Sequence, residues 1–136
     1  MYTTFNKEII KPREAIAKCN LLFVFGTLKR GYHNHRRLLR AEFVARAKSI
    51  SVECAMTQRG GFPLMYLDRP VEGCSVVGEI YRVTEDDMIS TDQLEGYPRF
   101  YNRRIERFMV GSREVNAWIY YNEDFKSGDF CEEWNA

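Results

Sequence analysis

The stretch "LLFVFGTLKRGYHNH", Leu21 to His35, changes character in its middle. Its first five residues are apolar and Gly26 follows them, which predicts a short buried strand at the start of the core. After such a strand, successive backbone N–H groups can point the same way and, with the Thr27 hydroxyl, form a cradle for an anion or an oxyanion. The alternative is that Gly26 only makes a turn and Lys29-Arg30 is a solvated corner. The spacing of a phosphate-binding P-loop is absent.

Downstream of this stretch, the clearest helix signal is "TEDDMISTDQLEG" at 84–96. Thr84 is a suitable N-cap, acidic residues occupy the first turn, and Gly96 stands just beyond the end. Two further strand-like runs, 101–110 and 113–121, are separated by a Gly-Ser pair that suits a two-residue hairpin turn. We therefore expect a helix followed by a hairpin.

The other segments mix strand, helix and loop patterns. They predict a short helix after Pro12 and a second at 34–41 that Asn34 caps. One bent strand or two are expected at 42–56, followed by a loop at 58–70 with an extended piece at 64–67. A further strand is expected at 74–83, in which Gly78 marks a bulge or a close backbone approach. The order of elements favours an α+β fold with a small mixed, mainly antiparallel, barrel-like sheet and a few short helices.

The composition is typical of one globular domain, since the 136 residues are 45% hydrophobic and 14% aromatic. We expect a single domain over 1–136, with an N-terminal extension at 1–19, a core at 21–121, and a C-terminal tail at 122–136 that has no clear element. The longest apolar run, Leu21 to Phe25, is too short to cross a bilayer, and the first twenty residues lack the apolar stretch of a signal peptide. We therefore expect a soluble, cytoplasmic protein with no membrane partner. The sequence does not indicate the oligomeric state, for which a monomer is the default expectation.

The charges are nearly balanced, with 20 Lys and Arg against 19 Asp and Glu, which is not typical of a protein that tracks polyanions. The segment 29–48 concentrates seven cations with two histidines and one acid. Because it carries no recognisable binding motif, we favour a solvated helix face and expect no nucleic-acid partner.

Metal and redox motifs are missing. His33 and His35 have no third ligand near them, so no metal site is expected. The cysteines form no C-x-x-C pair, which indicates reduced thiols, with Cys54 and Cys74 as small buried hydrophobes. The sequence has four cysteines, Cys19, Cys54, Cys74 and Cys131.

A second candidate site is "DQLEGYP", Asp92 to Pro98. Glu95 falls in the last turn of the predicted helix, where the negative end of the helix dipole disfavours a carboxylate. If Glu95 turns inward, desolvation raises its pKa and suits it to general acid–base catalysis near neutral pH. The neighbours expected around it are Leu94, Tyr97, Phe100 and Tyr101. The alternative is a solvated glutamate at a frayed helix end.

Four motifs, taken in order, resemble those of the γ-glutamyl cyclotransferase-like family, which includes γ-glutamylamine cyclotransferases and AIG2-like proteins. The family loop "Y-G-T-L-K-x-G-x-x-N-H" is matched by FGTLKRGYHNH at 25–35. The other three are GEIYRV at 78–83, TDQLEGYPRFYNR at 91–103 and AWIY at 117–120. Together the motifs span most of the chain.

The resemblance implies a cavity in a small barrel, with the glycine loop at one wall and Glu95 opposite. In this family the α-amine of a γ-glutamyl amide attacks its own side-chain carbonyl, which closes 5-oxoproline and expels the attached amine. Glu95 would take a proton from the α-ammonium and return it to the leaving nitrogen. The backbone of Gly26, Thr27 and Leu28 would hold the substrate carboxylate or the developing oxyanion.

The resemblance also assigns supporting residues. Tyr101 and Tyr120 would line the pocket with Phe25, and Arg103 would support it from a strand. The reaction would need neither metal nor cofactor, and the partner would be a small γ-glutamyl substrate. The K-x-G-x-x-N-H loop in a short chain is most similar to the γ-glutamylamine branch of the family.

Two positions depart from the family pattern. Phe25 stands where tyrosine is usual, so a hydroxyl that could touch the ligand is missing. Thr91 replaces a leucine, a change expected to affect only packing. The Phe25 replacement supports an alternative function, a catalytically silent module that binds a small molecule or a peptide end in the same pocket.

Overall fold

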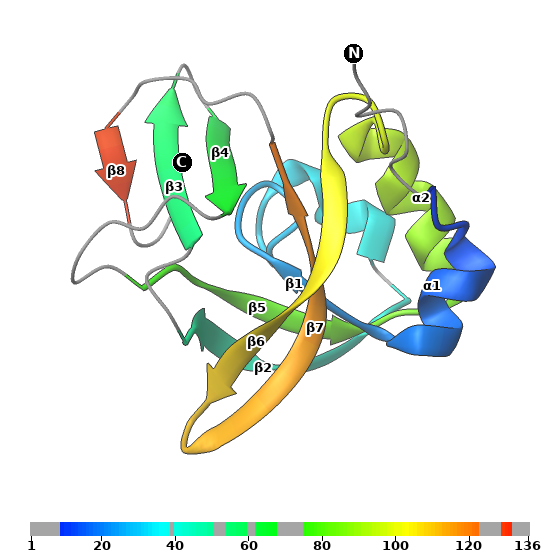
Figure 1. Ribbon diagram of the computed structural model, residues 1–136, viewed down its shortest axis with the longest axis horizontal. Coiled ribbons are helices and arrows are strands. Elements are labelled where there is room, and N and C mark those ends of the chain that lie inside the picture. The colour runs from blue at the N-terminus through cyan, green and yellow to red at the C-terminus, as the bar shows by residue number, and fades with distance from the viewer. Residues whose placement is uncertain are drawn as a thin grey trace, which may run out of the picture.

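The computed structural model describes residues 9–38, 40–50, 54–59, 62–67, 75–122 and 129–131. Five strands close a barrel in the order β1-β5-β2-β6-β7, in which every pairing is antiparallel except the parallel contact of β1 with β7 (Figure 1). The strands are β1 (Leu21–Val24), β2 (Glu42–Ser49), β5 (Val77–Arg82), β6 (Asn102–Val110) and β7 (Arg113–Tyr121). The predicted α+β fold with a mixed, mainly antiparallel, barrel-like sheet is confirmed.

A separate three-stranded sheet lies beside the barrel (Figure 1). Its strands are β4 (Phe62–Leu67), β3 (Cys54–Arg59) and β8 (Asp129–Cys131). The extended piece predicted at 64–67 lies in β4, whereas the loop predicted for 58–70 is wrong at 58–59 and 62–63, because β3 and β4 pair as a hairpin with Pro63 opposite Gln58. Proline is tolerated here because β4 is an edge strand. The tail predicted to lack elements supplies β8, and 42–56 forms two strands rather than one.

Two α-helices pack together along one side of the barrel (Figure 1). The first is α1 (Pro12–Lys18), which begins at the proline as predicted and lies within the region expected to be an N-terminal extension. Its Ala15 is fully buried, and the Trp118 indole N–H donates to the carbonyls of Ala15 and Cys19 at 3.2 and 2.8 Å. This helix therefore contributes to the hydrophobic core.

The second helix, α2 (Glu85–Glu95), has the predicted ends. Thr84 and Asp87 form a reciprocal capping box, and Gly96 ends the helix in the left-handed conformation with φ 65°. The predicted helix at 34–41 is instead a 3-10 helix, η2 (His33–Leu38). Asn34 lies inside η2 and does not cap it, because its side chain bonds to Thr27.

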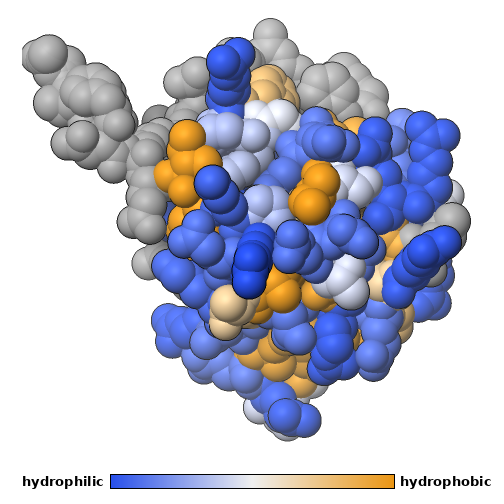
Figure 2. Space-filling view, turned by 90° about the vertical axis from the view of Figure 1, so that its right-hand side faces the viewer, coloured by the Kyte–Doolittle hydropathy of each residue, from blue (hydrophilic) through white to orange (hydrophobic). Residues whose placement is uncertain are grey.

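Figure 2 looks onto the side of the molecule that carries the two helices. This face is mainly hydrophilic, and its apolar residues are scattered rather than gathered into one patch. Ile9 and Ile89 are among the exposed apolar side chains. None of the helices formed by the described residues has the length and apolar character needed to span a bilayer.

Gly78 permits the close contact of β5 with β1. A Cβ at this position would lie 2.3 Å from the Val24 carbonyl oxygen and 2.7 Å from the Phe23 ring. Of the two predicted explanations for Gly78, a close backbone approach is therefore the correct one. The register irregularity of this part of the sheet lies in β2, between Phe43 and Ala45.

The replacement Gly78→Ala is expected to lower the free energy of unfolding by about 3 kcal/mol or to prevent folding, since the barrel offers no room for the methyl group. Gly111→Ala is the control: it has φ 62° but nothing within 4 Å of its would-be Cβ, so only the backbone strain of about 1–2 kcal/mol remains. Urea unfolding of both variants measures the difference. A loss at Gly78 no larger than that at Gly111 would contradict the steric argument.

Candidate functional site

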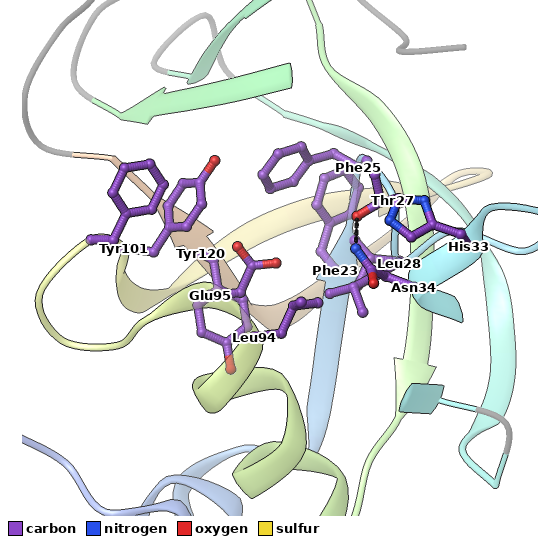
Figure 3. Close-up of a pocket in the computed structure, with 13 residues that line it drawn as sticks. Phe23, Phe25, Thr27, Leu28, His33, Asn34, Leu94, Glu95, Tyr101 and Tyr120 are labelled. Atoms are coloured by element: carbon purple, nitrogen blue, oxygen red, sulfur yellow. Dashed lines mark hydrogen bonds between the residues drawn. The ribbon is translucent and has the colours of Figure 1, made fainter. Parts of the chain in front are cut away.

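A cavity of about 340 Å³ opens between the segment that follows β1 and the C-terminal end of α2 (Figure 3). All seven residues predicted for the site line it: Phe25, Gly26, Thr27, Leu28, Glu95, Tyr101 and Tyr120. Leu94 and Phe100, which were expected beside Glu95, also line it, and the structure adds four residues that the sequence did not single out for it: Phe23, Val24, His33 and Asn34. Segments about seventy positions apart along the chain thus form one site.

The three carbonyl groups of the loop 26–28 accept hydrogen bonds from the residues that follow the loop, within 29–35. Lys29 N–H donates to the Gly26 carbonyl at 2.9 Å, and Asn34 N–H donates to the Thr27 carbonyl at 3.1 Å. The His35 ring nitrogen Nδ1 lies 2.9 Å from the third carbonyl, that of Leu28, and donates to it.

The amide N–H groups of this loop remain available. Those of Gly26, Thr27 and Leu28 have no hydrogen-bond acceptor among the described residues. In a trans peptide the N–H points opposite to the C=O of the same plane, so each carbonyl that is held outward turns the next N–H the other way. The loop therefore presents unpaired donors, as an anion or oxyanion cradle requires.

The basic corner of the loop differs from the expected solvated turn. Lys29 is 3% exposed and its ammonium lies 5.4 Å from the centre of the Tyr32 ring. Arg30 is exposed, stacks over Phe43 at 4.1 Å, and its backbone N–H donates to a Glu79 carboxylate oxygen at 2.8 Å. The alternative of an ordinary solvated turn is therefore wrong for Lys29.

Glu95 turns inward from the last residue of α2. Its carboxylate faces the side of the cavity formed by Phe25, Thr27 and Leu28 (Figure 3). Burial raises the pKa of Glu95 to about 7, against a smaller opposing effect of the Arg37 charge. No described residue donates a hydrogen bond to this carboxylate. The solvated, frayed alternative is therefore wrong, and Glu95 can exchange protons near neutral pH.

The helix end is fixed by backbone bonds in the turn that follows Glu95. The N–H of Tyr97 donates to the Asp92 carbonyl at 3.0 Å, and the N–H of Phe100 donates to the Gly96 carbonyl at 2.9 Å. Tyr101 N–H then donates to the Glu95 carbonyl at 3.2 Å. These bonds set the direction in which the Glu95 side chain leaves the helix.

One turn before Glu95, Asp92 is the centre of a buried polar network. The Arg103 guanidinium donates to both Asp92 carboxylate oxygens at 2.8 Å, and the Tyr120 hydroxyl donates to one of them at 2.5 Å. The Thr91 hydroxyl lies 2.8 Å from the Tyr120 hydroxyl. The network thus ties α2 to β6 and β7 and fixes the helix turn that carries Glu95.

This network changes two of the sequence predictions and adds one residue that the sequence did not predict for the site. The ring of Tyr120 lines the cavity as predicted, but its hydroxyl points to α2 and away from the Glu95 carboxylate (Figure 3). Thr91 does more than pack, because it bonds to Tyr120. Asp92 was not predicted, although its spacing three residues before Glu95 places both on neighbouring turns of one helix face.

Tyr101 supplies the second tyrosine of the cavity wall. It is 6% exposed, and burial together with the negative charge of Glu95 raises its pKa above the ordinary value. Its hydroxyl therefore keeps its proton near neutral pH. Phe100 packs edge-on against the Tyr101 ring, with the ring centres 5.0 Å apart, and is 52% exposed at the mouth of the cavity.

The histidine and cysteine predictions are resolved only in part. Within the described ranges, no three His, Cys, Asp or Glu side chains come together as metal ligands. Cys19 is a free thiol. The side chains of Cys54, Cys74 and Cys131 lie outside the described residues, so their predicted burial stays a prediction.

Removing the charge of Glu95 is expected to change how stability depends on pH. The pKa of Glu95 is about 7 in the folded protein and 4.5 ordinarily, so protonated Glu95 contributes to the stability of the folded state at low pH. The wild type loses this contribution as pH rises from 4.5 to 7, and it is absent above 7. The free energy of unfolding of Glu95→Gln minus that of the wild type should therefore be about 2–3 kcal/mol more favourable to the variant at pH 8 than at pH 4. Urea unfolding from pH 4 to 8 tests this, and a pH-independent difference would contradict the buried position.

Known proteins resemble this chain in sequence and in fold. The family model described as gamma-glutamyl cyclotransferase, AIG2-like, matches residues 22–135. A candidate gamma-glutamylcyclotransferase of Drosophila melanogaster is 34% identical over 119 residues, which cover 82% of this chain and 75% of that protein. Gamma-glutamylaminecyclotransferase A of Danio rerio is 33% identical over 119 residues, or 80% of this chain and 73% of the relative. The crystal structure of an AIG2-like protein from Mus musculus has a TM-score of 0.76 and 26% identity, over 85% of this chain and 88% of the other.

Proposed function

The chain belongs to the γ-glutamyl cyclotransferase, AIG2-like family, and from this premise we propose that it cleaves γ-glutamyl amides, releasing 5-oxoproline and a free amine. The observation that carries the proposal is the position of Glu95 across one cavity from the unpaired amides of the loop 26–28. The similarity to gamma-glutamylaminecyclotransferase A of Danio rerio favours γ-glutamylamines, including the γ-glutamyl-ε-lysine type, as substrates.

The reaction begins with a proton transfer. Near pH 7 the substrate α-amine is an ammonium ion and cannot attack a carbonyl. Glu95, whose pKa of about 7 matches this condition, accepts one proton from it as a general base. A carboxylate without other hydrogen-bond donors among the described residues is free to take up that proton.

Ring closure follows within the substrate. The neutral amine forms a bond to the side-chain carbonyl carbon, and the carbonyl oxygen becomes an oxyanion. The oxyanion reforms the carbonyl and the C–N bond to the leaving amine breaks, while protonated Glu95 returns its proton to that nitrogen. The ring nitrogen loses its second proton as it becomes the lactam N–H, and Glu95, again a carboxylate, passes this proton to the released amine, which leaves as an ammonium ion. Since nucleophile and electrophile belong to one molecule, the cavity accelerates the step mainly by folding the substrate into a reactive shape.

The loop and the aromatic wall have complementary tasks in this scheme. The N–H groups of Thr27 and Leu28 donate hydrogen bonds to the substrate carboxylate or to the oxyanion that forms during ring closure. Tyr101 forms the cavity wall beside Glu95. Phe25 is 8% exposed and contributes an apolar wall without a hydroxyl, so the backbone donors carry the polar recognition at this end.

The test is to incubate the protein with γ-glutamyl-ε-lysine, γ-glutamylbutylamine and γ-glutamylalanine and to quantify 5-oxoproline by chromatography. Turnover of at least one, with stoichiometric release of the amine, is expected, and the two γ-glutamylamine-type compounds should be preferred. No product from any of them, with binding retained in calorimetry, would favour the catalytically silent binding module. The replacement of the family tyrosine by Phe25 is the feature that supports this second function.

A further inference from the structure

We propose that Asn34 is a positioning residue that fixes the Thr27 hydroxyl as a hydrogen-bond donor to the α-carboxylate of a bound γ-glutamyl substrate. The inference rests on the proposed function and concerns how the same site recognises its ligand. Asn34 and Thr27 both line the cavity, on the wall that faces Glu95 (Figure 3).

The direction of one hydrogen bond decides the role of the hydroxyl. The Asn34 side-chain amide donates through Nδ2 to Thr27 Oγ1 at 2.8 Å (Figure 3). An NH₂ group can only donate, so Thr27 Oγ1 is the acceptor and its own hydrogen remains to be donated elsewhere. Among the described residues no atom accepts that hydrogen. The hydroxyl of Thr27 is therefore an oriented donor without a protein acceptor, in the wall of the cavity.

Asn34 holds Thr27 at a second point. Its backbone N–H donates to the Thr27 carbonyl at 3.1 Å, which also orients the peptide whose N–H belongs to Leu28. One residue of η2 thus controls the side chain and the backbone of the loop. The Thr27 hydroxyl and the Leu28 N–H belong to neighbouring residues and can act on the same ligand group.

The charges in the cavity indicate which ligand group these donors serve. Glu95 is the only acid among the described residues that line it, and it lies on the opposite wall. The substrate ammonium is therefore attracted to Glu95, while its α-carboxylate is the one permanent anion and needs donors. Hydrogen bonds to a charged group are stronger than those to a neutral one, so a fixed hydroxyl has its largest effect there.

A double-mutant cycle separates this role from a merely structural one. Thr27→Val removes the donor, and Asn34→Ala removes its anchor without adding charge. With γ-glutamylbutylamine as substrate, Thr27→Val should raise KM by about tenfold or more, and Asn34→Ala by about fivefold, with kcat changed less than threefold. In the Thr27→Val background, Asn34→Ala should change KM by less than twofold, and Thr27→Ser should restore wild-type KM.

The substrate provides the matched control. In an analogue whose α-carboxylate is a primary carboxamide, the remaining carbonyl oxygen is a neutral and weaker acceptor, so both replacements should change KM, or Ki as a competitive inhibitor, by only about threefold or less. Equal effects on the two compounds, or additive effects in the cycle, would overturn the inference. A fall in kcat alone would assign the hydroxyl to the oxyanion instead and would also overturn it. If the wild type neither binds nor converts γ-glutamylbutylamine, the proposed function itself is wrong, a result distinct from an additive cycle.

Discussion

Glu95→Gln is expected to lower the rate of 5-oxoproline formation by about 10²- to 10⁴-fold, the usual contribution of a positioned general acid–base group. Glutamine has nearly the same shape, so the cavity stays intact. It cannot accept a proton from the substrate ammonium or return one to the leaving nitrogen. Because the lost interaction acts on proton transfer, kcat should carry most of the change and KM should stay within a few fold.

The matched control for this variant is Glu85→Gln. Glu85 begins the same helix, is exposed to solvent, and lies outside the cavity. Its replacement makes the same chemical change and should leave kcat within twofold. Steady-state kinetics with chromatographic detection of 5-oxoproline compare the two. Undiminished turnover by Glu95→Gln would exclude the proton shuttle while leaving the family and the fold untouched.

Arg103→Met is expected to lower the free energy of unfolding by about 3–5 kcal/mol, because it leaves the Asp92 carboxylate buried without its cationic partner. The Arg103 side chain is fully buried and the Asp92 side chain 11% exposed. Arg103 also donates to the Ile10 carbonyl at 2.7 Å and lies 4.0 Å from the centre of the Tyr97 ring. Its loss therefore loosens the contacts among β6, α2 and the segment before α1.

Two further variants show that the effect comes from the unpaired charge. Arg103→Met combined with Asp92→Leu removes both charges and should recover at least half of the lost stability. Arg104→Met is the surface control: its ion pair with Glu106, at 2.7 Å, is partly exposed and should be worth less than 1 kcal/mol. Urea unfolding measures all three. Equal losses for Arg103→Met and Arg104→Met would contradict the buried-pair argument.

Elements with strong local signals could be predicted from the sequence. The helix α2 has its cap at Thr84 and its stop at Gly96, and the hairpin β6–β7 turns at Gly111 as predicted. The small sheet could not be predicted in the same way. The strands β4 and β8 depend on backbone pairing with β3, and neither Pro63 nor the polar tail indicates such a partner locally.

For the candidate site, the sequence by itself determined the parts: a glycine loop after a buried strand, and a glutamate at a helix end before Gly96 and Pro98. Only the tertiary structure decided how these parts face each other and how the pKa of the glutamate is shifted. Glu95 has a raised pKa because β-strand and loop residues distant in sequence surround its carboxylate and partly bury it.

The hydrogen-bond partners of Tyr120 and Asn34 also depended on the tertiary structure. The Tyr120 hydroxyl bonds to Asp92, and Asn34 bonds to Thr27 rather than capping a helix. Each choice depends on which buried donors and acceptors come within hydrogen-bond distance, and a buried polar group must take the partner that the fold supplies. Residue types and spacing therefore determined which chemistry was possible, and long-range contacts decided which groups can perform it.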